Sequence, residues 1–276
     1  MPGPDFNTTS FGLLRDQVVV ITGASQGIGK GIALGCARQG AHVVLHYLGN
    51  EQTAKDVDEI VKEIRNIDPT RKTVVVGGDI SNPTTSTRIV EESLKTFGRI
   101  DCLVSNAGIC PFYSFLDIPH DVWNLTRSVN LDGTFYVVQV ESRRLACAKQ
   151  MKGQTPQGGS IVAVSSISAL VGGGQQAHYT PTKAGVKSLM ESCAISLAPY
   201  HIRCNSVLPG TIETPINAED LSRPEKRQHM EGRVPLGRLG RPEDLAGPTI
   251  FLLSTMSSYV TGASVLVDGG AFVNLQ

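Results

Sequence analysis

Short apolar runs and amphipathic segments alternate along most of the chain. The apolar runs are rich in valine and isoleucine and have the length of buried strands; they cover residues 17–22, 41–47, 73–79, 100–108, 158–166, 201–210 and 263–270. Helical patterns separate them, at residues 30–40, 51–66, 83–97, 119–152, 177–199 and 241–253. Strict alternation of strand and helix predicts right-handed βαβ units. We therefore predict an α/β fold with a doubly wound parallel sheet of about seven strands and helices on both faces.

Two polar stretches depart from this pattern. Residues 1–16 are interrupted by proline and glycine and predict a flexible N-terminal arm. No linker divides the remaining residues, 17–276, into two self-contained halves, so they predict a single domain. Within that domain, residues 211–233 are polar, charged and irregular in pattern, which is typical of a mobile lid at a ligand-binding edge.

The charge balance and the cysteines narrow the functional classes. The chain has 25 basic and 25 acidic residues and no basic stripe, which argues against nucleic acid or an anionic membrane as a partner. Its six cysteines are scattered, with no Cys-x-x-Cys motif and no Cys/His cluster, so no metal site is predicted. The sequence shows neither a secretion leader nor an apolar run long enough to span a membrane. These features predict a cytoplasmic protein.

A glycine-rich turn joins the first strand to the first helix. The segment TGASQGIG, residues 22–29, contains Gly23, Gly27 and Gly29. Glycines in this context let the backbone approach a pyrophosphate, and the helix N-terminus offers unpaired N–H groups. An ordinary glycine-rich turn is the alternative. Two further polar residues, Asp79 and Asn106, end strands at the edge where α/β sheets bind ligands, although both types also favour turns.

Tyr179 and Lys183 are the strongest candidates for chemistry. Four residues apart on a helix, they share one face, so an ammonium can lie beside a phenol. A free tyrosine titrates near about 10 and a neighbouring cation favours phenolate, so we expect Lys183 to lower the pKa of Tyr179 toward neutrality. Such a phenol can act as a general base toward an alcohol and as a general acid toward a ketone. Pro181 requires the helix to begin close to Tyr179.

Two more polar residues would complete this site. Ser166 ends the fifth apolar run, and its hydroxyl could hold the reacting oxygen. Asn130 lies among apolar neighbours in the helix predicted over residues 119–152, where its amide needs partners. It is either satisfied there by protein groups or holds a water molecule beneath Lys183.

Taken together, these motifs resemble the short-chain dehydrogenase/reductase family, from about residue 17 to the C-terminus. The matching features are TGASQGIG at 22–29, Asp79, SNAG at 105–108, Asn130, the spacing of Ser166, Tyr179 and Lys183, PGTIET from Pro209, and VDGG near the end. The resemblance implies a Rossmann-type, dinucleotide-binding catalytic domain over residues 17–276, and a homotetramer. Ser105 stands where asparagine commonly opens the Asn-Asn-Ala-Gly motif, but Asn106 is kept.

The resemblance also implies roles for individual residues. Asn130, Ser166, Tyr179 and Lys183 would form a catalytic tetrad. The implied cofactor-binding residues are Gly23, Ser25, Gln26, Gly27, Ile28, Gly29, Tyr47, Asp79, Ile80, Asn106, Ala107, Gly108, Tyr179, Lys183, Pro209, Gly210, Thr211, Ile212 and Thr214. An acidic residue at the end of the second strand favours NAD over NADP. Tyr47 takes that position here and no arginine stands ready to bind a 2′-phosphate, so the sequence permits both cofactors.

A closer resemblance links the chain to the sugar 1-dehydrogenases of this family. It rests on the segments SNAGICPF, SSISALVGGGQQAHYTPTKAG, DLSRPEKRQHMEGRVPLGR and GGAFVNLQ. It implies oxidation of the anomeric hydroxyl of an aldose to the lactone, with L-rhamnose as the first candidate and Tyr179 as the base. Substrate contacts are then expected from Ser166, Ser168, Gln176 and Tyr179.

Two other functions remain open at this point. An NADPH-dependent ketoreductase of a small, aromatic or polyketide carbonyl would use the same site. Residues 217–232 are mostly polar and charged, however, which favours a hydroxyl-rich substrate. A nucleotide-sensing protein could keep the fold and lack catalysis, because fold alone does not define function. The presence of all four tetrad residue types argues against that second alternative.

Overall fold

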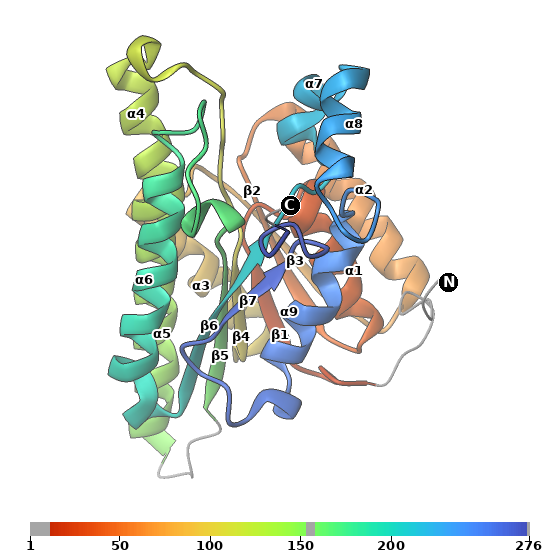
Figure 1. The fold of residues 1–276 in the computed structure, drawn as a ribbon. Coiled ribbons are helices and arrows are strands. Elements are labelled where there is room, and N and C mark those ends of the chain that lie inside the picture. The colour runs from red at the N-terminus through yellow and green to blue at the C-terminus, as the bar shows by residue number, and fades with distance from the viewer. Residues whose placement is uncertain (1–11, 153–157, 275–276) are drawn as a thin grey trace.

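Seven parallel strands form one sheet in the computed structural model, which describes residues 12–152 and 158–274 (Figure 1). The strands are β1 (Val18–Ile21), β2 (His42–Tyr47), β3 (Thr73–Gly77), β4 (Cys102–Ser105), β5 (Gly159–Val164), β6 (Ile202–Pro209) and β7 (Ser264–Val267). Their order is β3-β2-β1-β4-β5-β6-β7, and each adjacent pair is parallel. The order reverses between β1 and β4, which is where an open α/β sheet binds its ligand. The predicted fold class is confirmed.

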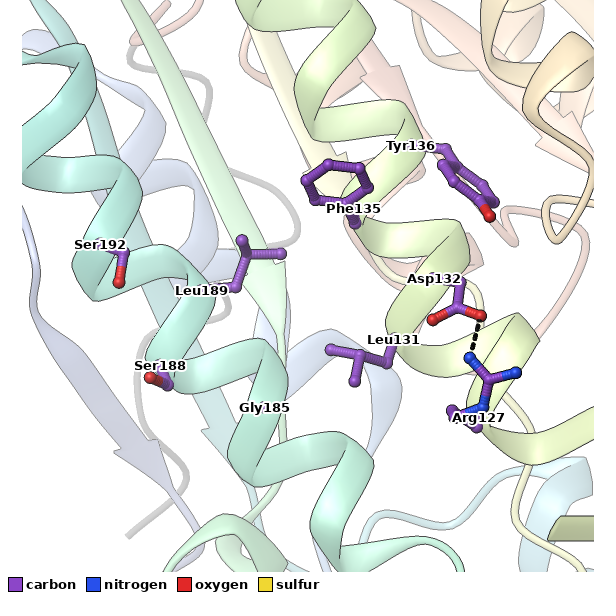
Figure 2. A pocket seen from close by; sticks show the side chains of 9 residues that line it. All are labelled: Arg127, Leu131, Asp132, Phe135, Tyr136, Gly185, Ser188, Leu189 and Ser192. Atoms are coloured by element: carbon purple, nitrogen blue, oxygen red, sulfur yellow. Dashed lines mark hydrogen bonds and ion pairs between the residues drawn. The ribbon is translucent and has the colours of Figure 1, made fainter. Parts of the chain in front are cut away.

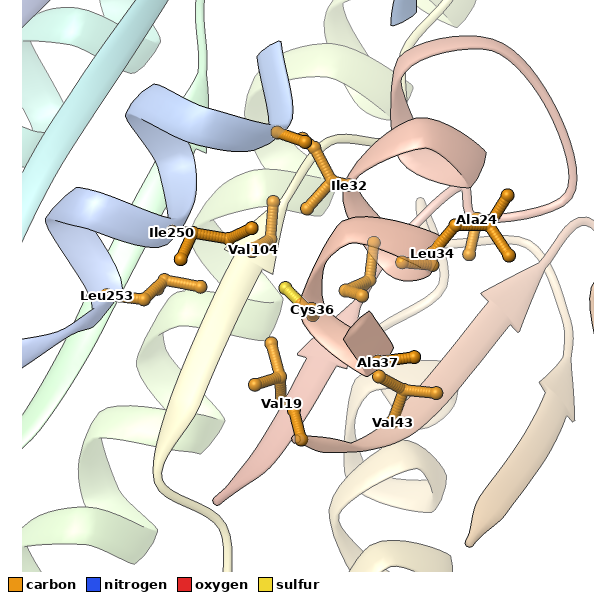
Figure 3. Close-up of a cluster of buried hydrophobic side chains, with 14 of the residues drawn as sticks. Val19, Ala24, Ile32, Leu34, Cys36, Ala37, Val43, Val104, Ile250 and Leu253 are labelled. Atoms are coloured by element: carbon orange, nitrogen blue, oxygen red, sulfur yellow. The ribbon is translucent and has the colours of Figure 1, made fainter. Parts of the chain in front are cut away.

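Helices cover both faces of this sheet (Figure 1). One face carries α1 (Gly27–Arg38), α2 (Glu51–Ile67) and α9 (Ala246–Leu253), and the other carries α3 (Pro83–Phe97), α5 (Gly133–Lys152) and α6 (Thr180–Leu197). Each face has its own apolar core. Figure 3 shows the first, where Val19 and Val104 of the sheet meet Ile32 of α1 and Ile250 of α9. Because helices bury the central strands on both sides, the sequences of β1 and β4 are almost wholly apolar and all their residues are buried.

The helix predicted over residues 119–152 contains a π-turn. Helix α4 (His120–Arg127) continues through the π-turn Ser128–Asp132 into α5. A π-turn adds a residue to the helical repeat and so rotates the faces on its two sides relative to each other. Of the apolar residues on the two sides of this π-turn, Val138 is buried whereas Leu125 and Phe135 are exposed.

The last residues of the predicted N-terminal arm belong to the core. Leu14 is fully buried, and its N–H donates to the Gln39 carbonyl at 3.1 Å. Asp16 N–H donates to the Gly40 carbonyl at 2.8 Å. The apolar Leu13-Leu14 pair outweighs the turn signal of Gly12, so the arm prediction is wrong for residues 12–16. Residues 1–11 lie outside the described part of the chain.

The segment predicted to be an irregular lid is largely helical. It forms a 3-10 turn at Pro215–Asn217 and the helices α7 (Ala218–Leu221) and α8 (Pro224–Gly232), seen above the strand ends in Figure 1. A capping box between Thr214 and Asn217 begins the first turn. The polar residues that suggested irregular chain cover an exposed helix surface, so that part of the prediction is wrong. Mobility of this lid stays a prediction.

Candidate active site

The glycine turn presents the N-terminus of α1 toward the lid. Gln26 occupies the cap position without a side-chain capping bond, and the first turn holds no acidic residue. The first N–H groups of α1 and its positive dipole end are therefore open to an anion. Gly27 has a φ of +53°, and a Cβ added to it would lie 3.2 Å from Thr214 Cγ2. The turn, with Ser25 buried and Ile28 packed on the core, fits the pyrophosphate of a dinucleotide.

The end of β4 holds the glycine turn in place. The Asn106 amide donates to the carbonyls of Thr22 (2.9 Å) and Gly23 (3.0 Å). In return, the Thr22 hydroxyl accepts from the N–H groups of Asn106 and Ala107. A Cβ on Gly23 would lie 2.8 Å from Ala107 Cα, and one on Gly29 would collide with the Gly23 carbonyl. Asn106 and Ala107 thus fix the shape of the predicted cofactor turn.

His46, which the sequence analysis did not single out, joins this turn to the end of β3. Its Nδ1 accepts from the Gly23 N–H at 3.3 Å, and its Nε2 donates to the Gly78 carbonyl at 2.8 Å. These partners require a neutral ring with its proton on Nε2. The ring is 2% exposed, and its burial lowers the pKa of His46 to about 4. The only signal in the sequence is a polar residue inside an apolar strand.

The buried neutral His46 predicts a pH-dependent stability. An unfolded histidine binds a proton near pH 6.5, whereas the folded one resists it down to about pH 4. Its contribution to the free energy of unfolding is therefore complete above about pH 6.5 and is lost as the pH falls to about 4, by about 3 kcal/mol. We expect thermal unfolding of His46→Asn to show a weaker decline over this interval than the wild type. An unchanged decline, matching that of the control His120→Gln on the surface, would contradict this role.

Asp79 and Ile80 follow β3. The Asp79 carboxylate accepts from the N–H and the hydroxyl of Ser81, at 2.9 and 2.8 Å through Oδ1. This is the turn-forming role that the sequence left as an alternative. Ile80 is buried and packs with the core on the α3 face. Asp79 and Ile80 therefore have fixed positions at the end of β3, where the adenine is predicted to lie.

An arginine lies at the corner formed by the ends of β2 and β3, although the sequence analysis found no arginine ready to bind a 2′-phosphate. Tyr47 and Gly77 are partners in the β2–β3 register, and a Cβ on Gly77 would lie 2.9 Å from the Tyr47 hydroxyl. Arg88 of α3 reaches the corner and donates a hydrogen bond to the Gly77 carbonyl. Only the fold reveals this, because α3 brings Arg88 back over the end of β3.

Tyr179, Lys183 and Ser166 come together at the C-terminal edge of the sheet. Tyr179 caps α6, and Pro181 lies in the first turn of that helix, as the sequence predicts. Lys183 Nζ lies 5.6 Å from the centre of the Tyr179 ring and donates to the Val164 carbonyl at 2.9 Å. The Ser166 hydroxyl lies near the Tyr179 phenol and favours its ionised form. The three side chains thus lie close together beyond the end of β5.

The expected acidic phenol is not present in this structure. Burial raises the pKa of Tyr179 well above its usual value, and a smaller effect of Cys110 acts in the same direction. Ser166 opposes the rise by favouring the ionised form. Some surface of the ring remains accessible, but protein atoms crowd its hydroxyl, so desolvation dominates. Burial also lowers the pKa of Lys183 to about 8. The expectation that Lys183 lowers the pKa of Tyr179 toward neutrality is wrong for this structure, because burial of the phenol dominates and raises its pKa.

Asn130 lies in the π-turn and bridges β4 to α6. Its amide oxygen accepts from the Ile109 N–H at 2.8 Å, and its amide nitrogen donates to the Ile109 carbonyl at 2.9 Å and to the Thr182 hydroxyl at 3.2 Å. Protein groups therefore satisfy this side chain, one of the two alternatives left open by the sequence. A Cβ on Gly108 would lie 3.1 Å from the same amide oxygen and 3.5 Å from Lys183 Nζ. The SNAG motif, Asn130 and Lys183 thus form one packed unit.

The predicted substrate residue Gln176 belongs to a polar cluster. Its amide nitrogen donates to Cys110 Sγ at 3.3 Å, and its amide oxygen lies 3.5 Å from the Ser168 hydroxyl, at the limit of a hydrogen bond. His178 Nε2 donates to the Pro111 carbonyl at 2.8 Å. The sequence analysis did not identify Cys110 or His178 as site residues, because their contacts join two segments far apart in the chain.

The remaining predicted cofactor residues follow β6; they are Pro209, Gly210, Thr211, Ile212 and Thr214. Pro209 ends the strand beside Val267 of β7, and the Gly210 N–H donates to the Val267 carbonyl at 3.0 Å. The Thr211 carbonyl accepts from Gly240, and Ile212 is buried. These contacts therefore fix the segment that runs from the edge of the sheet to Thr214.

Two features of the described residues bear on other classes of protein. Within residues 12–152 and 158–274, no three His, Cys, Asp or Glu side chains gather as metal ligands do. None of the described helices is both long and apolar enough to cross a membrane.

The fold and the site are matched by proteins of one family. A family model described as enoyl-(acyl carrier protein) reductase matches residues 23–271. The crystal structure of a short-chain type dehydrogenase/reductase from Mycobacterium marinum has a TM-score of 0.84 and 33% identity, covering 94% of this chain and 96% of that one. The chain therefore belongs to the short-chain dehydrogenase/reductase family, whose members are oxidoreductases.

Two relatives carry a more specific name. The L-rhamnose 1-dehydrogenase (NAD(P)(+)) of Azotobacter vinelandii is 54% identical over 264 residues, which cover 96% of this chain and all of that protein. The L-rhamnose 1-dehydrogenase (NADP(+)) of Thermoplasma acidophilum is 44% identical over 262 residues, 95% of this chain and 98% of that protein. The resemblance to sugar 1-dehydrogenases is confirmed.

Proposed function

We propose that this enzyme oxidises the anomeric hydroxyl of L-rhamnose to the lactone, with NAD⁺ or NADP⁺ as hydride acceptor. The observation that carries the proposal is the joint position of the Ser166 hydroxyl, the Tyr179 phenol and the Lys183 ammonium at the sheet edge that also holds the glycine turn. The names of the two relatives supply the sugar and the cofactors.

In this proposal, Tyr179 takes the proton of the sugar O1 while the hydrogen on C1 leaves as hydride, so that a C1 carbonyl forms. A bound oxidised nicotinamide would supply the hydride acceptor and a positive charge. Ser166, which lies near the Tyr179 phenol, holds O1 beside the phenol oxygen. Lys183 binds the nicotinamide ribose. Asn130 holds α6, which begins after Tyr179 and carries Lys183, against the segment that follows β4. In the reverse direction Tyr179 donates its proton to a carbonyl.

The resting phenol of Tyr179 is neutral, because burial raises its pKa. Phenolate must then form in the complex with oxidised cofactor, where a second positive charge adds to that of Lys183. Formation of phenolate after cofactor binding limits when the base is present. A buried phenolate does not persist in the free enzyme, so the base appears only when a hydride acceptor is in place.

A substrate panel tests the proposal. L-rhamnose, other aldoses and a set of aromatic and aliphatic ketones are assayed by absorbance at 340 nm with each cofactor, and the sugar product is identified by NMR. We expect reduction of NAD⁺ or NADP⁺ with L-rhamnose and a lactone as the product. Reduction of ketones with inert sugars would favour the ketoreductase alternative, and silence with both classes would favour a nucleotide-sensing protein.

Gln176 is proposed to bind sugar hydroxyls at the wall of the site. Its amide is oriented by Cys110 and Ser168, which leaves further hydrogen-bonding capacity on both amide atoms. We expect Gln176→Ala to raise KM for the sugar by about 10-fold, the loss of about one hydrogen bond, with cofactor KM unchanged. Gln175→Ala, next to it and exposed, is the control. An unchanged sugar KM in Gln176→Ala would contradict the assignment.

We further propose that the chain assembles as a homotetramer through the α5 and α6 face. Figure 2 shows a hollow on this face between Leu131 and Phe135 on one side and Leu189 on the other. Phe135 is 42% exposed and Ile195 is 80% exposed, which is unusual for large apolar side chains on neighbouring helices. Light scattering after size exclusion is expected to give four times the chain mass, and Phe135→Glu is expected to give a smaller species. A monomeric wild type would contradict this assembly.

The lid and the cellular setting are also part of the proposal. Residues 211–233 are proposed to close over the sugar, supported by the position of Thr214, whose Cγ2 would lie 3.2 Å from a Cβ added to Gly27, and by the polar surface of α7 and α8. A reducing, cytoplasmic setting is supported by the five described cysteines, all of which are free thiols.

A further inference from the structure

The corner at the ends of β2 and β3 is shaped around the Arg88 side chain. A guanidinium nitrogen of Arg88 donates to the Gly77 carbonyl. A Cβ on Gly78 would lie 2.5 Å from the same nitrogen, and Gly78 has a φ of +153°, so a side chain there would displace the guanidinium. The Gly78 N–H in turn donates to the Tyr47 carbonyl at 2.9 Å. Two glycines in sequence thus bring an arginine of α3 beside Tyr47.

The charge of Arg88 is not neutralised by a carboxylate. The side chain is exposed, and within the described part of the chain it forms no ion pair. Asp79 is the nearby acid, and its Oδ1 accepts both bonds from Ser81. Both charges act on the buried His46, whose pKa is lowered first by burial and also by Arg88, whereas Asp79 acts in the opposite direction. The Arg88 guanidinium has five N–H donors, and the Gly77 carbonyl accepts from only one of them.

We propose that Arg88 binds the 2′-phosphate of NADP(H). This inference rests on the proposed cofactor site, in which the adenosine lies at the ends of β2 and β3. An acidic residue at the end of β2 would bind a ribose 2′-hydroxyl and repel a phosphate, and Tyr47 removes that repulsion. Arg88 supplies the cation that the end of β2 lacks, and the planar guanidinium matches a phosphate with two parallel hydrogen bonds. The Tyr47 hydroxyl, on the Gly77 side of the corner, adds a neutral donor.

Binding measurements without sugar test this proposal. Isothermal titration of the full chain with NADP⁺, NAD⁺, 2′,5′-ADP and 5′-ADP compares wild type with Arg88→Gln. Arg65→Gln removes an exposed arginine from the far end of α2 and controls for net charge. We expect Arg88→Gln to weaken NADP⁺ and 2′,5′-ADP by about 10- to 100-fold and to leave NAD⁺ and 5′-ADP unchanged, because charged hydrogen bonds of this kind carry that much affinity. Arg65→Gln should change none of the four.

The outcomes separate this proposal from its alternatives. Equal weakening of all four ligands would assign Arg88 to the shared adenosine and overturn the proposal, as would unchanged binding of NADP⁺. Arg88→Lys keeps the charge and is expected to keep most of the preference for 2′-phosphorylated ligands. If it binds them as weakly as Arg88→Gln, the charge is not what matters and the proposal fails. Because no sugar is present, a failure of rhamnose oxidation would leave these results unaffected.

Discussion

Tyr179→Phe is expected to lower kcat for sugar oxidation by about 10³-fold or more, while the affinity for NAD⁺ and NADP⁺ stays close to that of the wild type. The substitution removes one hydroxyl and keeps the ring, so the packing at the start of α6 is retained. What is lost is the proton acceptor, and a positioned general base contributes about 10²- to 10⁴-fold. Loss of the phenol oxygen near Ser166 adds to the effect, because the hydroxyl that holds O1 loses a polar neighbour.

Steady-state kinetics together with fluorescence titration of the reduced cofactor separate the two quantities. Tyr259→Phe is the matched control, since that tyrosine is fully exposed on the surface. If Tyr179→Phe kept most of its turnover, the assignment of the base would be wrong. If its cofactor affinity fell as steeply as its turnover, Tyr179 would be a binding residue and the proton would have another acceptor.

Lys183→Met is expected to damage both catalysis and cofactor binding. The ammonium lies beside the Tyr179 ring and is held by the Val164 carbonyl, and it has no counter-ion among the described residues. Its removal takes away the charge that favours phenolate and also the proposed donor to the nicotinamide ribose. We expect kcat to fall by about 10²-fold or more and the cofactor Kd to rise by about 10-fold.

The pH dependence gives a further signature of Lys183. Burial lowers its pKa to about 8, so in the free enzyme the ammonium is present below about pH 8 and is lost as the pH rises through that value. Cofactor affinity of the wild type should therefore decline above about pH 8, and that of Lys183→Met should not. Lys187→Met, one turn further along α6 and ion-paired with Glu191, is the control and should behave as the wild type. A decline that persists in Lys183→Met would assign it to another group.

The strands, the layer arrangement and the order of the motifs could be predicted from the sequence because they depend on local patterns. Most strands are short runs rich in apolar residues, and the helix predicted over residues 83–97 coincides with α3, Pro83–Phe97, which Asn82 caps and Gly98 ends. The glycine turn was recognisable because strand, turn and helix follow one another in the chain.

The features that the sequence did not reveal depend on contacts between distant segments or on solvent exclusion. His46, Cys110 and Arg88 gain their roles only when β2, β3, β4 and α6 meet at one edge. The neutral phenol of Tyr179 is a consequence of burial, which helical spacing does not report. The lid helices were missed because their apolar content is low, and they are held instead by capping and by ion pairs such as that of Arg227 with Glu231.

Deuterium transfer from L-[1-²H]rhamnose tests the central claim most directly. The enzyme is incubated with this sugar and with NAD⁺ or NADP⁺, and the reduced cofactor and the sugar product are analysed by mass spectrometry. Oxidation at C1 by hydride transfer predicts a reduced nicotinamide that carries one deuterium and a lactone that carries none. A reduced cofactor without deuterium, or a product oxidised at another carbon, would contradict the account.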